Sequence, residues 1–141
     1  MVLGNIMEQS KVYFGFALAD SMFTGDVLVE RRILTHEQVA IEVARGVISC
    51  CNVSHEATVR AMRNRFGLHV ATPETPSRVE LARGDSVIVM GVRGLPRLTE
   101  RREYTDEEIA GATFQFSEYR VSAKFMAPRG FETDLTRISG G

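Results

Sequence analysis

The feature that most constrains this chain is a short apolar and aromatic run near its start, VYFGFAL, from Val12 to Leu18. A continuous run of this length is typical of a strand that is buried inside a sheet. Such a strand needs other strands beside it and further layers packed against it. We therefore expect a central strand here, in a chain of 141 residues that is long enough for one core and one domain.

The next segments carry alternating strand and helix signals. Apolar and charged residues alternate from Val27 to Leu34, as in an edge strand. Thr35 and Gln38 have the spacing of a capping box, which predicts a helix that ends at the next glycine. Its apolar face is predicted to comprise Val39, Ala40, Val43 and Val47. Ser54 is a favourable N-cap for a second helix, which is predicted to end at Gly67.

The second half of the chain predicts three more strands and a short helix. Two strands, Arg78 to Leu81 and Ser86 to Val92, are expected to form a hairpin around the turn at Gly84-Asp85. A helix with acidic residues in its first turn begins at Thr105, and a long alternating strand runs from Phe114 to Phe125. The pattern as a whole predicts a single α/β domain with a mixed sheet of about five strands flanked by helices. We place an N-terminal extension at 1–11, this domain at 12–127 and a polar C-terminal tail at 128–141.

The composition excludes several classes of protein. The chain is 44% hydrophobic and 25% charged with a formal net charge of −1, which is too apolar and too neutral for a disordered protein. It has no apolar run of about 20 residues that would cross a membrane, so we expect no membrane partner. Its neutral charge argues against a protein that coats DNA. The first residues, MVLGNIMEQSK, do not form a signal peptide, and we expect a cytosolic protein.

Cysteine and histidine usage predicts neither a disulfide nor a metal centre. Cys50 and Cys51 are adjacent and are poorly placed to link distant segments, so we interpret them as small buried residues in a reducing compartment. The histidines at 36, 55 and 69 have no spacing that matches a zinc site. We therefore expect no metal and no cofactor.

His55 is then the strongest candidate for chemistry. It lies in the first turn of the second predicted helix, where free N–H groups and the positive end of the helix dipole favour a bound phosphate. A histidine there can contact a phosphodiester that those amides hold. The alternative is that His55 is one more polar residue in an N-terminal turn, which by position alone is the commoner case.

The arginines indicate a phosphate-binding site less strongly than His55 does. Arginine makes up 15 of the 17 basic residues, and its guanidinium suits bidentate phosphate recognition, although a GC-rich genome produces the same bias. Arg78 follows a loop with two prolines, and Arg97 follows the break at Gly94-Leu95-Pro96, where ligand-contacting residues are often found. Glu100 follows three residues after Arg97. Either arginine taken alone is more simply a solvated surface residue.

A series of short segments shares its order with a known family. The segments are Val12-Tyr13-Phe14-Gly15, Ser21-Met22-Phe23, Ser54-His55-Glu56-Ala57-Thr58, Arg78-Val79-Glu80-Leu81, Asp85-Ser86-Val87-Ile88-Val89, Arg97-Leu98-Thr99-Glu100 and Tyr104-Thr105-Asp106-Glu107-Glu108-Ile109. Each segment is short and common, but the ordered series over 12–123 resembles the viral ring-nuclease anti-CRISPR family of archaeal viruses and bacteriophages.

The resemblance implies a homodimer that binds cyclic tetra-adenylate, the second messenger of type III CRISPR defence, and cleaves it without a metal. It implies a viral or proviral protein that acts in the host cytoplasm. His55 would be the general acid on the leaving 5′ oxygen, Arg97 would stabilise the developing charge, and Glu100 would orient the reacting groups. Arg78 would hold another phosphate, and Glu56 would belong to the ligand-facing helix start. Because RNA carries its own 2′-OH nucleophile, these few groups suffice for the chemistry.

The sequence departs from the family at ligand-facing positions. Phe16 and Ser21 stand where the family has asparagines, and Gly91 stands where it has a glutamine. Loss of an amide from a ligand site weakens recognition by roughly 1–3 kcal/mol, although Phe16 offers a ring on which a base can stack. Two other functions therefore stay open: a non-catalytic sponge that sequesters a cyclic nucleotide, and a viral module that binds protein and shares only the fold.

Overall fold

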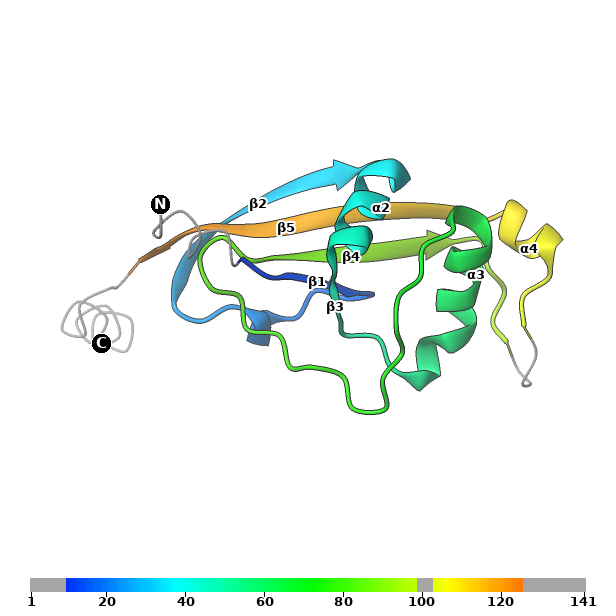
Figure 1. Ribbon diagram of the computed structural model, residues 1–141, viewed down its shortest axis with the longest axis horizontal. Helices are drawn as coiled ribbons and strands as arrows, with labels where there is room; N and C mark the ends of the chain where they lie inside the picture. The colour runs from blue at the N-terminus through cyan, green and yellow to red at the C-terminus, as the bar shows by residue number, and fades with distance from the viewer. Residues whose placement is uncertain (1–9, 99–102, 126–141) are drawn as a thin grey trace, which may run out of the picture.

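The computed structural model describes residues 10–98 and 103–125, which contain a five-stranded mixed sheet with helices packed on it (Figure 1). The strands are β1 (Val12–Gly15), β2 (Asp26–Leu34), β3 (Ile48–Ser49), β4 (Ser86–Arg93) and β5 (Thr113–Phe125). The helices are α2 (His36–Arg45), α3 (Glu56–Phe66) and α4 (Asp106–Ala110), with 3-10 helices η1 (Asp20–Met22) and η2 (Val53–His55). The predicted fold class is confirmed. Most of the predicted extension and all of the predicted tail lie outside the described residues.

The strand order in the sheet is β2-β5-β4-β1-β3. β1 pairs in parallel with both β3 and β4, whereas β5 pairs antiparallel with β4 and β2. β1 is thus an internal strand, as its apolar sequence predicts, but it ends at Gly15 rather than at Leu18. A Cβ added at Gly15 would lie 3.3 Å from the Cβ of Cys50, so the chain that leaves β3 passes close to this point. The short strand β3 has no signal of its own in the sequence.

Helix α2 begins and ends where its sequence predicts. The Thr35 hydroxyl accepts a hydrogen bond from the Gln38 N–H at 3.1 Å, and the Gln38 side chain accepts one from the Thr35 N–H at 2.8 Å. Gly46 follows as the C-cap. Val39 is completely buried, but Ala40 is exposed, so its predicted place on the apolar face is wrong. The helical rotation of about 100° per residue turns Ala40 away from the sheet.

The start of α3 differs from the prediction. Ser54 is not its N-cap, because a 3-10 turn, η2, precedes the helix and is capped by Asn52. The Asn52 side chain accepts a hydrogen bond from the Ser54 N–H at 2.8 Å, and the Ser54 hydroxyl also bonds to it. The helix ends as predicted at Gly67, which adopts the left-handed conformation with φ 73°.

The predicted hairpin before β4 is wrong. Residues 78–81 are not a strand, and β4 pairs instead with β1 and β5. The alternation that suggested a strand has another cause: Val79 and Leu81 are buried because this irregular segment packs against the sheet. The Leu81 N–H donates to the Met22 carbonyl at 2.8 Å, which joins this segment to η1. A buried loop can therefore carry the same period-two pattern as a strand.

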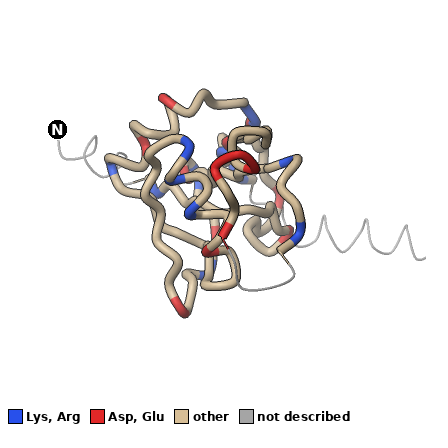
Figure 2. Tube along the Cα trace, turned by 90° about the vertical axis from the view of Figure 1, so that its right-hand side faces the viewer, with Lys and Arg blue, Asp and Glu red and all other residues tan. Residues whose placement is uncertain are grey.

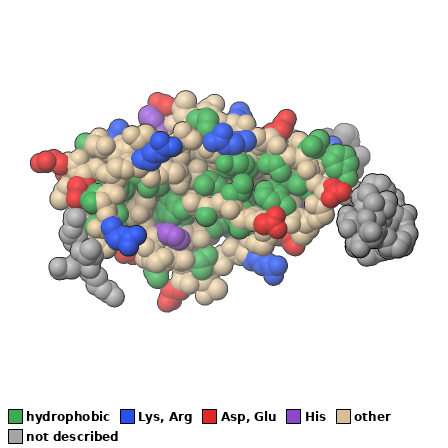
Figure 3. Space-filling model, turned by 180° about the vertical axis from the view of Figure 1, so that it is seen from behind, with side chains coloured by type: hydrophobic (Ala, Val, Ile, Leu, Met, Phe, Trp, Pro, Cys, Tyr) green, Lys and Arg blue, Asp and Glu red, His purple; other side chains and the backbone are tan. Residues whose placement is uncertain are grey.

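The two faces of the sheet are covered differently. Helices α2 and α3 lie together over one face, and their Val39, Val59 and Met62 pack against apolar side chains of β1, β4 and β5 (Figure 1). The opposite face holds a smaller cluster covered by η1 and the 79–81 segment. Seen from this side, apolar side chains remain visible across the middle of the molecule (Figure 3). None of the described helices has the length and hydropathy to span a bilayer.

The adjacent cysteines are free and lie near the end of β1, and we expect both to resist alkylation. Burial and the neighbouring Cys51 thiol raise the pKa of Cys50 from 9.0 to about 11, and burial also raises the pKa of the completely buried Cys51. At pH 8 such a shift reduces the reactive thiolate of Cys50 about 100-fold. We predict that iodoacetamide labels the native protein about 100-fold more slowly than the protein in guanidinium chloride, as measured by mass spectrometry. Equal rates in the two states would contradict this prediction.

Candidate functional site

His55 is held at the junction between η2 and α3. It is the last residue of η2 and the N-cap of α3, at the end of the loop that follows β3. Its Nδ1 accepts a hydrogen bond from the backbone N–H of Asn52 at 3.1 Å. This bond and the Asn52 side-chain bond to the 3-10 turn together form a capping box. His55 therefore has a structural role in addition to any chemical one.

The ring of His55 is oriented by an aromatic neighbour. Phe16, just beyond the end of β1, contacts it edge-on with ring centroids 4.9 Å apart and an interplanar angle of 73°. Phe16 also packs edge-on against Phe14, which is completely buried in the core. Since Nδ1 is an acceptor, the neutral ring carries its proton on Nε2, which forms no hydrogen bond within the described part of the chain. The structure thus presents one free N–H donor of a half-buried ring.

The helix start beside His55 also carries negative charge. Glu56 is exposed and pairs with Arg60 at 3.3 Å, one turn further along α3. Arg60 in turn contacts Glu103 at 3.0 Å. A carboxylate in the first turn satisfies the helix dipole in the same way as a bound anion would. Glu56 is thus placed at the predicted helix start, but its ion pair is with Arg60 and not with His55.

The other predicted site residues are spread over several loops. Ser21 lies exposed in η1, and Arg78 lies exposed in the loop that leads to the buried Val79. Arg97 is exposed in the segment after β4, and Glu100 lies outside the described residues. Within 10–98 and 103–125, no hydrogen bond or ion pair joins the side chain of Ser21, Arg78 or Arg97 to another residue. Among the predicted site residues that the structure describes, a side-chain contact joins only His55 and Phe16.

Basic and acidic residues are interspersed at the end of the molecule that carries α4 (Figure 2). Figure 2 looks onto the end that carries α4 and shows Lys and Arg on several segments, with acidic residues among them. The acidic residues of α4 are Asp106, Glu107 and Glu108. A polymeric nucleic acid would need a continuous basic surface, whereas a small anionic ligand needs only a few placed cations. The described residues at this end therefore do not form a continuous basic surface of the kind that a nucleic-acid chain needs.

Gly91 lies in β4 beside a cavity of about 310 Å³. The lining residues are Gly91, Val92, Arg93, Thr113 and Gln115, from β4 and β5. Arg93, Thr113 and Gln115 were not predicted as site residues. Their proximity depends on the register between β4 and β5, which links residues distant in the sequence.

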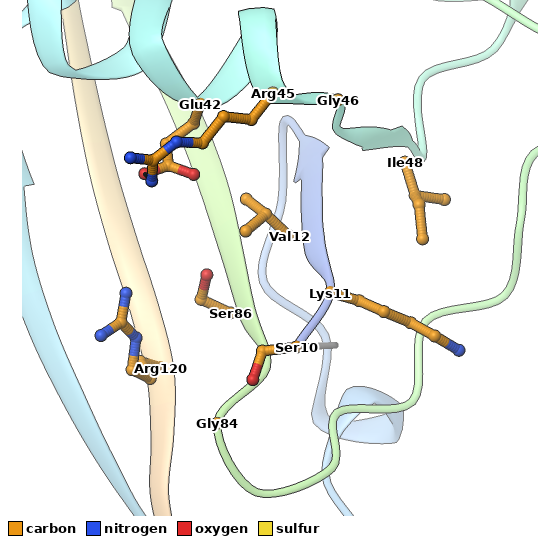
Figure 4. Close-up of a pocket in the computed structure, with 10 residues that line it drawn as sticks. All are labelled: Ser10, Lys11, Val12, Glu42, Arg45, Gly46, Ile48, Gly84, Ser86 and Arg120. Atoms are coloured by element: carbon orange, nitrogen blue, oxygen red, sulfur yellow. Dashed lines mark ion pairs between the residues drawn. The ribbon is translucent and has the colours of Figure 1, made fainter. Parts of the chain in front are cut away.

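A larger cavity of about 520 Å³ lies at the opposite end of the parallel strands, below the last turn of α2 (Figure 4). Arg45 and Arg120 project beside it, and the Lys11 side chain extends away (Figure 4). Arg45 pairs with Glu42 at 3.6 Å and Arg120 pairs with Glu118 at 3.1 Å. Both guanidinium groups are thus balanced by carboxylates, and no sequence-predicted site residue lines this cavity.

Glu118 is a buried carboxylate behind this cavity. Burial alone raises its pKa, but the hydrogen bond from Arg32 and the charges of Arg120 and Arg32 outweigh burial and hold the pKa below its usual 4.5. Arg32 Nε donates to one carboxylate oxygen at 2.9 Å, while Arg120 and the Ser86 hydroxyl donate to the other at 3.1 and 3.2 Å. All of these bonds lie within the protein, which indicates a structural role. No group of three His, Cys, Asp or Glu side chains in the described segments is placed to hold a metal ion.

A comparison with solved structures finds the same fold in a viral protein. B116 of Sulfolobus turreted icosahedral virus superposes with a TM-score of 0.60 over 79% of this chain and 99% of B116. The sequences are 18% identical, so the likeness concerns the fold. No protein-family model matches the chain, and no curated protein sequence matches it.

Proposed function

We propose that this chain is a metal-independent ring nuclease that cleaves a cyclic oligoadenylate, with cyclic tetra-adenylate as its first substrate. The observation that carries the proposal is the hydrogen bonding of the His55 ring. Its Nδ1 accepts a hydrogen bond from the Asn52 N–H, while its Nε2 has no partner among the described residues and can contact a ligand. The ordered sequence resemblance and the fold shared with a protein of an archaeal virus also support it. On this proposal the protein is of viral or proviral origin and acts in the host cytoplasm against type III CRISPR immunity.

The proposed reaction needs few groups from the protein. A ribose 2′ oxygen forms a bond to the adjacent phosphorus, its proton passes to solvent, and the bond from that phosphorus to the 5′ oxygen breaks. His55 gives a proton from Nε2 to the leaving oxygen, and Arg97 stabilises the negative charge on the phosphoryl oxygens. Glu100 orients these groups, and Arg78 holds a second phosphate. The products are a 2′,3′-cyclic phosphate and a free 5′-hydroxyl, and no cofactor takes part.

The proposal includes a homodimer. The face of the sheet away from α2 and α3 is partly uncovered, and Val29 and Ile33 on β2 are 38% and 53% exposed there. Exposed apolar side chains on one sheet face favour association with a partner surface. A two-fold dimer would also double each arginine around a cyclic ligand, which has matching symmetry. Sedimentation velocity of the full chain would test this part of the proposal.

The direct test is incubation with cyclic tetra-adenylate in EDTA, followed by chromatographic separation of the products. We expect linear di-adenylate that carries a 2′,3′-cyclic phosphate. A ring that is bound tightly and recovered intact would instead identify a sponge. Absence of binding to any member of a panel of cyclic nucleotides would contradict both functions.

One contact favours the sponge as a second candidate. A histidine that acts as a general acid must carry a proton on both ring nitrogens. Nδ1 of His55 accepts a hydrogen bond from Asn52, and the bond must open before Nδ1 can be protonated. A ligand that only binds needs no such change, because the neutral Nε2–H already donates. Whether a bound phosphate opens this contact therefore separates cleavage from sequestration.

Arg97 should matter more for cleavage than for binding, because the charge that it meets develops in the transition state. We predict that Arg97→Ala lowers kcat about 100- to 1,000-fold while the Kd for the ring rises less than about 10-fold. Arg97→Lys should restore activity only in part, since an ammonium lacks the bidentate fork. Arg83→Ala, which removes another exposed arginine, is the matched control. Equal losses of kcat and affinity in Arg97→Ala would contradict the assigned role.

A further inference from the structure

The cavity between β4 and β5 is built by residues that the strand register places opposite one another. Gly91 pairs with Gln115, and Arg93 pairs with Thr113. Residues two apart on a strand point to the same face, so these four positions share one face of the sheet. Their neighbour Val92 packs into the core beneath α2 and α3, which places the four on the opposite, partly open face.

Gly91 leaves a notch in this face. An added Cβ would come no nearer than 4.0 Å to any atom, the closest being the Gln115 carbonyl oxygen. The φ angle of Gly91 is not positive, so its backbone does not require glycine. A side chain at this position would therefore begin without a clash and would extend from the strand toward the cavity that Gly91 lines. Neither backbone geometry nor packing accounts for a glycine at this position.

Arg93 stands apart from the other strand arginines. Arg31 bonds to Tyr119 and Ser117, while Arg32 and Arg120 both bond to Glu118. Arg93 and Gln115 are exposed, and although their backbones belong to the β4–β5 ladder, neither side chain makes a hydrogen bond or ion pair with any residue that the structure describes. The cavity thus has a free guanidinium and a free carboxamide on its walls, with no protein carboxylate among its lining residues to neutralise the charge.

We propose that this cavity is a nucleotide subsite in which Arg93 binds a phosphate and Gln115 recognises the base. A guanidinium binds phosphate oxygens in a bidentate manner, and a glutamine amide can pair with the amine and ring nitrogen of adenine. The notch at Gly91 lets the nucleotide approach the strand backbone. A volume of about 310 Å³ is small for a ligand site, which suits one nucleotide rather than a whole ring. This inference rests on the proposed function, and it names two residues that would bind the phosphate and the base of the proposed substrate.

The first test compares two arginines at opposite ends of β4. Calorimetric titration of the full chain would use 2′-deoxy cyclic tetra-adenylate, which lacks the nucleophile and cannot be cleaved by this route. We expect Arg93→Ala to raise the Kd at least 10-fold. Arg83→Ala removes an equal charge from the turn before β4 and should change the Kd less than 2-fold. If the two substitutions raise the Kd equally, Arg93 contributes only its positive charge and not a specific phosphate contact, and the proposed subsite is wrong.

Two further variants test base recognition by Gln115 and the space that Gly91 leaves in the strand. Wild-type protein should bind the adenine ring more tightly than the corresponding hypoxanthine ring, which lacks the exocyclic amine, and Gln115→Ala should lose most of that preference. Gly91→Leu should raise the Kd at least 10-fold, with a Tm that stays within a few degrees of wild type. If wild type binds and these variants bind equally well, the subsite is wrong while the proposed function stands. If wild type binds neither this ring nor unmodified cyclic tetra-adenylate, the proposed function fails and the subsite with it.

Discussion

Replacement of His55 by glutamine should abolish ring cleavage and leave the fold intact. General acid catalysis by a placed histidine contributes about 100- to 10,000-fold to a rate, and a carboxamide cannot supply that proton. A glutamine can still accept the hydrogen bond that the Asn52 N–H now gives to Nδ1, because glutamine is a natural partner in capping boxes. We therefore expect kcat to fall by at least about 100-fold, with a Tm close to that of wild type. Single-turnover cleavage assays and thermal melts of the same samples measure the two effects.

His55→Ala is the matched control because it removes both roles. It should lose the same activity as His55→Gln and should also lower the free energy of unfolding by about 0.5–2 kcal/mol, the usual cost of losing a cap interaction. A glutamine variant that cleaves at the wild-type rate would exclude His55 as the general acid. If His55→Gln and His55→Ala are equally destabilised and the remaining folded protein is active, the role of His55 is only structural.

The fold was predictable to the extent that its signals are local. The capping box at Thr35, the helix start at Thr105 and the glycine that ends α3 depend on contacts within a few residues, and all are present. The pattern at Val79 and Leu81 misled because burial in an irregular segment has the same period as burial in a strand. A period reports which side chains are buried and does not report how the backbone is paired.

The site was predictable only in part for a related reason. His55 follows from its position at a helix start, which the sequence displays. Its contact with Phe16 joins segments far apart in the chain, as does the alignment of Arg93 with Thr113. A contact of that kind depends on strand order and register, which no local pattern specifies. The sequence could therefore name His55 and Phe16 separately but could not predict their contact, and it did not name Arg93.

The largest effect on stability is expected at Glu118, because its carboxylate joins three elements. It is 2% exposed and accepts hydrogen bonds from Arg32 on β2, Ser86 on β4 and Arg120 on its own strand. Removal of one partner from a buried ion pair costs about 3–5 kcal/mol when the remaining charge stays buried. Arg32 and Arg120 are 59% and 45% exposed and can be hydrated, so we expect Glu118→Ala to cost about 3 kcal/mol, the lower end of that range. Urea denaturation at pH 7 measures this cost, and Arg45→Ala, which removes an exposed ion pair, should cost less than about 1 kcal/mol.

The same carboxylate should make stability depend on pH. The pKa of Glu118 is lower in the folded protein than its usual 4.5, so the folded state binds its proton less readily than the unfolded state. The stabilising contribution is therefore fully present above about pH 4.5 and is lost as the pH falls through the folded pKa. Glu118→Gln cannot ionise, and the protonated wild type resembles it. The difference in unfolding free energy between wild type and Glu118→Gln should thus be largest at neutral pH and should shrink in acid. A difference that stays constant from pH 7 to pH 3 would mean that packing, and not the charge of Glu118, holds β2, β4 and β5 together.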